Sequence, residues 1–533
     1  MAEITKRRAS TLLTMAGLVM VLSLFSKIFG LIREQVLAAY FGATSEMDAY
    51  NIAFYLPNLI RMLLAETTLS SAFIPVFSSY LARKDRENAS VVANTVTNLV
   101  IVFFTGITVL LYIFAPNIVS ILPGLGESPY LFNLTVSMTR IMLPTLLFMS
   151  LSGLAAGLLN SYESFGVPAL SPVVFNLVII SSVVGLSGRW GILSLGFGVL
   201  LGTLGQFVFQ LPFLRGKELS YHPVIRLDHP GTRQIFAMAA PLILALGCVQ
   251  INISVDKIFA LTLPGGSVAI LNFASLIWYV PLGAFAGAIA TVLFPSISRA
   301  ASLGDVQSLR RFFSLGAREI IYLMLPATAG LMALSVPIVR LIYERGQFDA
   351  QATVNVALAL LCFAVGLLPY SLLGLLNKTF YSMKDARTPL KVALLSIFLN
   401  FLFDWILIRY LSFAGLALAT SFVGFINFIL LLAILRRRIG GVDGRRIANS
   451  FLKIVLATLI MMTVAYFSWD YLDAQLGRST GAQILSLGGG IFAGLTIYTI
   501  MSILLKIEEF QHIFTEIRLR MIRGKDETKK VAD

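Results

Sequence analysis

Ionisable side chains interrupt the first two apolar segments of the sequence, which join at residues 42–45. Each segment is long enough to cross a bilayer. A charged side chain near the bilayer centre costs at least ~2.5 kcal/mol on insertion scales, so it normally faces a hydrated cavity or a partner. The ionisable residues are Lys27, Arg33 and Glu34 in the first segment, and Asp48, Arg61 and Glu66 in the second. Cations on two neighbouring helices predict a positively charged cavity that binds an anion.

These residue types favour a phosphate ligand. A guanidinium donates two parallel hydrogen bonds to a phosphate, whereas a lysine ammonium acts as a point charge. We therefore expect Arg33 and Arg61, together with Lys27, to bind a pyrophosphate group. The three carboxylates would hold the arginines in place or respond to their occupancy. In the alternative interpretation, these charges only neutralise one another inside the helix bundle.

A second set of oxygen-bearing side chains lies in later apolar segments. Its members are Asp256, Asn400, Asp404 and Thr420. Asn400 and Asp404 are four residues apart, so they share one face of a helix. Oxygen ligands from three helices suit a small hard cation, so we expect a Na⁺ site that favours one conformation of a transporter. In the alternative, the two carboxylates pair with Lys257 and Arg409.

Composition identifies a polytopic membrane protein. Of 533 residues, 57% are hydrophobic and only 13% are charged, whereas about a quarter of the residues in a soluble domain are charged. Because Lys and Arg are retained in cytoplasmic loops, the net charge of +14 does not imply a nucleic-acid partner, and none is expected. The sequence has no P-loop and no HExxH motif, and its two cysteines lack metal-ligand spacing. We expect no enzyme, and no cofactor apart from a coupling ion.

Repeated apolar runs predict an all-α integral membrane fold of about fourteen transmembrane helices. Cations cluster in every second loop, as at residues 436–438, and this alternation places both termini in the cytoplasm. The predicted parts are an N-lobe (1–220) and a C-lobe (221–440) of about six spans each, two extra helices (441–510) and a basic cytoplasmic tail (511–533).

Short sequence patterns recur between the two lobes. They are Gly-Leu-Leu-Asn at 157–160 before Pro168 and at 374–377 before Pro389, and Tyr-Leu-Pro at 55–57 before Pro75 and Tyr-Val-Pro at 279–281 before Pro295. The copies are an even number of predicted spans apart, so they cross the membrane in the same direction. This predicts a parallel repeat, which is a known arrangement of secondary transporters. Chance similarity between leucine-rich helices is the alternative.

Several longer stretches carry a resemblance to a known family. They are FSKIFGLIRE, DAYNIAFYLPNLIRMLLAE, SSAFIPVFSSY, VLFPSISR, YERGQFD, YSMKDARTPLK and GLALAT. Through them, nearly the whole chain resembles the lipid II flippase family (MurJ, also called MviN) of the multidrug/oligosaccharidyl-lipid/polysaccharide exporter superfamily. The resemblance implies two six-helix lobes, and two C-terminal helices that line a groove for a lipid tail. It also implies transfer of undecaprenyl-pyrophosphate-linked peptidoglycan precursor to the outer leaflet by alternating access, driven by an ion gradient or the membrane potential.

By motif match, Arg33, Asp48 and Arg61 would be cavity residues of that family, and Lys27 stands where an arginine is usual. Leu276 replaces an arginine of the eighth span, so one expected cation is missing. Two other transport functions stay open, namely export of another polyprenyl-pyrophosphate-linked oligosaccharide and cation-coupled drug antiport. A non-transporting scaffold is a third alternative. The resemblance implies a bacterial inner-membrane location, with lipid II, membrane lipids and wall-synthesis proteins as partners.

Overall fold

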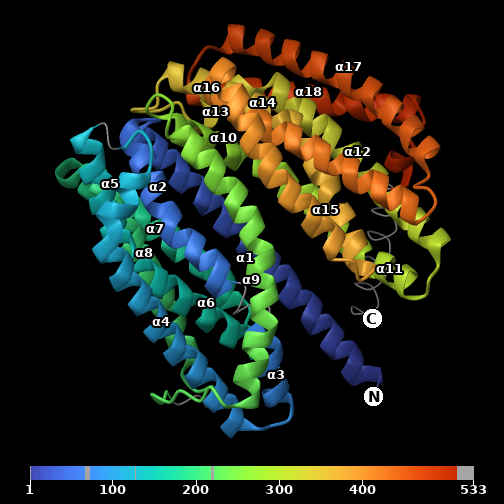
Figure 1. The fold of residues 1–533 in the computed structure, drawn as a ribbon. Coiled ribbons are helices and arrows are strands. Elements are labelled where there is room, and N and C mark those ends of the chain that lie inside the picture. Colours follow the sequence, from blue (N-terminus) through green and yellow to red (C-terminus); the bar gives the residue numbers. More distant parts are fainter. Residues whose placement is uncertain (1, 67–71, 126–127, 218–220, 513–533) are drawn as a thin grey trace, which may run out of the picture. The chain divides into compact units, whose positions relative to one another are not determined.

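The computed structural model describes residues 2–66, 72–125, 128–217 and 221–512, and every regular element in these ranges is a helix (Figure 1). The predicted all-α fold is therefore confirmed. Within these ranges the chain divides into two compact units. Unit 1 contains the residues up to Ala269 together with Arg345–Asp349, and unit 2 contains Ile270–Glu344 and the residues from Ala350 onward.

The helices of the first part of the chain are α1 (Ala2–Phe41), α2 (Ser45–Ile60), the π-helix η1 (Arg61–Glu66), α3 (Ile74–Ala82), α4 (Arg86–Ile121), α5 (Pro129–Met142), α6 (Thr145–Ser161), α7 (Gly166–Trp190), α8 (Leu193–Leu214) and α9 (Pro230–Ala260). The later helices are α10 (Ser267–Pro281), the π-helix η3 (Leu282–Ala286), α11 (Gly287–Ser302), α12 (Val306–Ala333), α13 (Ser335–Tyr343), α14 (Ala350–Val365), α15 (Leu367–Ser382), α16 (Arg387–Arg438), α17 (Gly444–Leu476) and α18 (Thr480–Leu504).

Many of these helices are long and apolar enough to cross a membrane. Within the described ranges 8 helical segments meet this criterion, or up to 10 if two bent pairs each form one span. The pairs are α12 with α13, bent by 74°, and α14 with α15, bent by 43°. One of the 8 segments, α16, contains a non-helical residue, Ser412, and so consists of two helices. The chain is thus a multi-pass membrane protein, and the predicted count of about fourteen spans is consistent with these helices but stays a prediction.

The core of unit 1 includes aromatic side chains from α3. Phe73 and Phe77 are fully buried, and their rings stack with centroids 5.2 Å apart. They pack with buried residues of α4, α6 and α9, such as Val92, Leu154 and Ile235. The loop at 345–349 belongs to this unit because Gln347 donates its backbone N–H to the Ala39 carbonyl at the end of α1, at 2.8 Å.

Each repeat contains a π-helix next to its Tyr-X-Pro motif. Pro57 lies in the last turn of α2, directly before η1, and Pro281 ends α10, directly before η3. A proline has no N–H to donate and its ring displaces the carbonyl one turn earlier, so the regular ladder is interrupted there. Short π-helical segments inside longer helices are often found at functional sites. The sequence motif therefore corresponds to a repeated backbone feature.

The turn that follows is also repeated. Lys84 and Gly304 adopt left-handed backbone conformations with φ of 58° and 68°. The next residue in each case is an aspartate that caps a helix: Asp85 accepts from the backbone N–H of Asn88 at 3.2 Å, and Asp305 accepts from that of Ser308 at 3.0 Å. Such caps satisfy N–H groups that have no partner within the first turn of a helix.

A third repeated turn joins later helices. Gly191, between α7 and α8, has φ 53° and ψ −137°, and Ser412, inside α16, has φ 52° and ψ −134°. Gly191 follows Pro168 at the same spacing as Ser412 follows Pro389. Three equivalent backbone features therefore recur in each half, which supports an internal repeat; its parallel orientation stays a prediction.

Ser412 holds a conformation that suits glycine, since a Cβ atom is strained at this φ and ψ. We predict that Ser412→Gly stabilises the purified protein by about 1 kcal/mol, because relief of strain exceeds the added chain entropy of glycine. The reverse change, Gly191→Ala, should destabilise it by a similar amount. Thermal unfolding in detergent micelles measures both. A lower melting temperature for Ser412→Gly would contradict the repeated turn.

Candidate anion-binding site

Arg33 is held by contacts from two helices. Its guanidinium forms an ion pair with Glu34 on α1 and donates to Asn176 Oδ1 on α7 at 3.1 Å. It also lies over the Phe175 ring, 5.7 Å from the centroid. The side chain is 22% exposed, and its buried Nε atom has no hydrogen-bond partner among the described residues. Arg33 is thus a positioned cation with unused donor capacity.

Arg61 begins the π-helix η1 and is partly buried. Its Nε and Nη2 atoms donate to Asn58 Oδ1 at 3.2 and 3.0 Å, one turn earlier. The side chain of Glu66, at the end of η1, lies outside the described residues, so its predicted role beside the arginines is not described. Both arginines belong to unit 1.

Lys27 lies on α1 and is exposed. Among the described residues, no hydrogen bond, ion pair or ring contact joins Lys27 to Arg33 or Arg61. An exposed ammonium on a helix of this apolar composition needs a hydrated or anionic environment. The predicted role of Lys27 therefore rests on its position in α1 and its charge.

Asp48 contacts the start of α10. Its carboxylate is buried and accepts from the backbone N–H groups of Gly266 at 2.6 Å and Ala269 at 2.7 Å. A carboxylate at the N-terminus of a helix satisfies unpaired N–H groups and interacts favourably with the helix dipole. The sequence predicted that Asp48 positions the arginines; the structure places its two oxygens on backbone groups of α10 instead. Glu34, by contrast, pairs with Arg33 as expected.

A polar seam between α2 and α9 was not predicted from the sequence. The Tyr55 hydroxyl contacts the Gln250 carbonyl at 3.1 Å and Ser254 Oγ at 2.9 Å. The Lys257 ammonium lies 5.0 Å from the Tyr55 ring centroid and interacts electrostatically with Asp256 and Asp48. The only sequence signal was the tyrosine of the repeated Tyr-X-Pro motif.

The four predicted cation ligands divide between the units. Asp256 belongs to unit 1, whereas Asn400, Asp404 and Thr420 belong to unit 2. Asn400 and Asp404 are buried on α16, and the Thr420 hydroxyl donates to the Leu416 carbonyl at 3.1 Å. No group of three or more His, Cys, Asp or Glu side chains that could hold a metal ion occurs in the described part of the chain. A shared cation site stays a prediction.

The turn between α15 and α16 carries a capping aspartate. Asp385 accepts from the Thr388 hydroxyl at 2.6 Å and from the Thr388 backbone N–H at 3.0 Å, and it pairs with Arg438. These contacts lower the pKa of Asp385 to about 2, with the Thr388 hydroxyl as the largest cause. Asp385 therefore caps the start of α16. The contacts are structural rather than ligand-binding.

Comparison with known families gives one match over most of the chain. A family model described as lipid II flippase MurJ matches residues 37–486. This range includes Asp48 and Arg61, whereas Lys27 and Arg33 precede it.

Curated relatives match along nearly their full length. A probable lipid II flippase MurJ from Rickettsia prowazekii is 31% identical over 496 residues, which cover 92% of this chain and 97% of the relative. The lipid II flippase MurJ of Burkholderia cenocepacia is 29% identical over 476 residues, covering 87% of this chain and 92% of the relative.

Solved structures agree with these matches. A structure of lipid II flippase MurJ in an inward closed conformation has a TM-score of 0.74 and 26% identity, and the match covers 91% of this chain and 98% of that one. An inward-facing multidrug resistance MATE family transporter of the MOP superfamily has a TM-score of 0.66 and 16% identity, with 80% and 99% covered. At that identity the second likeness shows the fold alone.

Proposed function

The chain belongs to the lipid II flippase family, and we propose that it transfers lipid II from the inner to the outer leaflet of the bacterial cytoplasmic membrane by alternating access. It is a multi-pass transporter whose ligands are lipid II and membrane lipids. Its work is translocation without a catalytic step, and both termini face the cytoplasm, as the loop charges predict. Contacts with wall-synthesis proteins are a further expectation.

The observation that carries this proposal is the state of Arg33. Glu34 and Asn176 fix the guanidinium in one orientation, while 22% of the side chain stays exposed. A guanidinium that is already ordered loses little entropy when it binds phosphate. Arg33 would therefore recognise the pyrophosphate that links the lipid to its glycopeptide.

Arg61 and Lys27 would complete the pyrophosphate site. Arg61 follows Pro57 on a π-helix, where the altered backbone ladder suits a position that changes during transport. Glu34 and Glu66 would balance the cations when the substrate is absent. Substrate can shift the transporter between its states only by as much as its affinity for the two states differs.

Leu276, where the family usually has an arginine, leaves one cation fewer, and Lys257 offers a positive charge at the seam between α2 and α9. Export of another polyprenyl-linked oligosaccharide is not favoured, because the matching family model and the relatives reported above carry the name lipid II flippase. Drug antiport has only fold-level likeness.

We predict that Arg61→Ala reduces exposure of lipid II on the outer leaflet by about ten-fold or more, because a charge-assisted hydrogen bond contributes about 1.5–3 kcal/mol. Cells that rely on this protein alone would be treated with an external enzyme that cleaves only outward-facing lipid II. Arg83→Ala, at an exposed loop arginine, is the matched control. Full exposure with folded Arg61→Ala would exclude a role for Arg61 in binding, and no exposure with the wild type would exclude lipid II as the substrate.

We also propose Na⁺ as the coupling ion, with Asn400, Asp404 and Thr420 of unit 2 as its ligands; the part predicted for Asp256, in unit 1, stays a prediction. The donors are carboxylate, amide and hydroxyl oxygens, which suit a small hard cation. Asp404 is buried on α16 and would supply the negative charge of the site.

Asp404→Asn should abolish stabilisation by Na⁺. Thermal unfolding of the purified protein would be compared in Na⁺ and in K⁺ at equal ionic strength. The wild type should melt at a higher temperature in Na⁺, as should the control Asp470→Asn, which changes an exposed carboxylate on α17. An equal Na⁺ effect in Asp404→Asn would rule out Asp404 as a ligand.

A further inference from the structure

A cavity of about 740 Å³ lies in unit 2, and its lining includes none of the residues assigned above to substrate or Na⁺. It is bordered by the first turns of α12, the linker before α17 and the segment after α18. The arginines that line it are Arg310, Arg311, Arg318 and Arg446, and His512 also borders it. On the predicted topology this end of unit 2 faces the cytoplasm.

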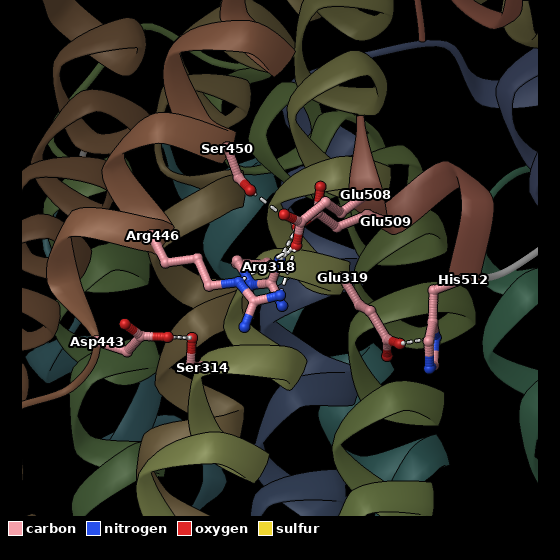
Figure 2. A network of polar contacts seen from close by, with 9 residues as sticks. All are labelled: Ser314, Arg318, Glu319, Asp443, Arg446, Ser450, Glu508, Glu509 and His512. Atoms are coloured by element: carbon pink, nitrogen blue, oxygen red, sulfur yellow. Dashed lines mark hydrogen bonds and ion pairs between the residues drawn. The ribbon is translucent and has the colours of Figure 1, made fainter. Parts of the chain in front are cut away.

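Two of these arginines are bound to carboxylates (Figure 2). Arg318 pairs with Glu509 at 2.5 Å and with Glu508 at 3.0 Å, and Arg446 pairs with Glu508 at 2.7 Å. Ser450 donates to Glu509 at 2.9 Å. Hydrogen bonds from Arg446 and Arg318 hold the pKa of Glu508 below its usual value. The inner wall of the cavity is therefore an ordered, charge-paired network.

The other two arginines have no carboxylate partner in the described chain. Arg310 donates to the neutral backbone carbonyl of Ile439 through Nε, at 2.6 Å, and through Nη2. Arg311 is exposed and forms no ion pair or hydrogen bond among the described residues. Two deeply buried atoms, Arg318 Nε and Glu509 Oε2, also lack hydrogen-bond partners there. The cavity lining carries four arginines and three carboxylates, Asp443, Glu508 and Glu509, so one positive charge is uncompensated.

The linker is shaped to fix Arg310. Gly440 has φ 69°, and a Cβ atom at this position would lie 2.6 Å from Arg310 Nη2. Gly441 and Asp443 also have positive φ, of 139° and 56°. The left-handed φ favours glycine at position 440, and the lack of a Cβ atom there leaves room for the Arg310 guanidinium beside the cavity.

The equivalent helix of the first repeat shows that this charge is specific to the second half. Aligning Asp85 with Asp305 places Asn94 and Asn98 of α4 opposite Ser314 and Arg318 of α12. In unit 1 that helix face is covered by an extended peptide: Asn98 Nδ2 donates to the carbonyls of His222 and Val224, both at 2.9 Å. In the first repeat, neutral amides therefore contact a segment of the same chain, whereas in the second repeat arginines line a cavity.

We propose that this cavity binds a phosphate group through Arg310 and Arg311, with Arg446 as a third, neighbouring cation. Guanidinium groups bind phosphate oxygens bidentately, and basic pockets on the cytoplasmic side of membrane proteins accept lipid headgroups. The phosphate belongs to an anionic phospholipid of the inner leaflet or to a soluble phosphate. Its binding would join the linker and the C-terminal segment to α12. This site is independent of the proposed pyrophosphate site, whose residues all lie in unit 1.

The test uses the full-length protein in nanodiscs, with thermal unfolding as the readout. In one arm phosphatidylglycerol replaces phosphatidylcholine stepwise; in the other, inorganic phosphate replaces chloride at fixed ionic strength. Arg311→Gln should raise the concentration needed for half-maximal stabilisation about five-fold, since a cation near the surface contributes about 1 kcal/mol. Gly440→Ala, which displaces Arg310, should act in the same direction. The control is Arg445→Gln, an exposed arginine outside the cavity lining.

A response to phosphatidylglycerol alone that weakens in Arg311→Gln assigns the site to a lipid headgroup. A response to inorganic phosphate that weakens in the same variant assigns it to a soluble phosphate. The proposal is overturned if neither probe stabilises the wild type, or if Arg311→Gln and Arg445→Gln respond alike.

Discussion

The cost of placing charge in hydrocarbon governs this structure. Each ionisable group deep in the bundle must find a partner, and the partners come from other helices or from backbone N–H groups. Arg33 is held by Glu34 and by Asn176 of α7, and Asp48 by the first N–H groups of α10. In unit 2, Arg340 pairs with Asp473 and lies 5.9 Å from the centroid of the Trp469 ring. These contacts join helices that are distant in the sequence, and they leave part of the Arg33 side chain exposed.

The repeat supplies backbone features rather than identical side chains. Both halves have a proline beside a π-helix and an aspartate that caps the helix after a left-handed turn. The side chains on equivalent faces differ, as the asparagines of α4 and the arginines of α12 illustrate. The two halves can therefore carry different binding sites on one architecture. The fold depends on turns and close backbone contacts, whereas ligand binding depends on the exposed side chains.

Sequence reasoning succeeded where the signal is local. Apolar length predicted the helices, and the recurring Tyr-X-Pro and Gly-Leu-Leu-Asn motifs predicted the repeat. Adjacent residues gave the Arg33–Glu34 pair. Sequence reasoning failed where a charged residue has an uncharged partner far away in the sequence. Asn176 is 143 residues from Arg33. Asp48 binds backbone N–H groups, which no side-chain pattern reveals.

We propose above that positioned cations of unit 1 recognise a pyrophosphate. The most direct measurement is the affinity of the purified protein for undecaprenyl pyrophosphate and for undecaprenol, which has the same tail and no phosphate. We expect the wild type to bind undecaprenyl pyrophosphate more tightly than undecaprenol. Arg33→Gln should lower this preference about ten-fold, while its affinity for undecaprenol stays unchanged. Equal affinities of the wild type for both lipids would contradict it.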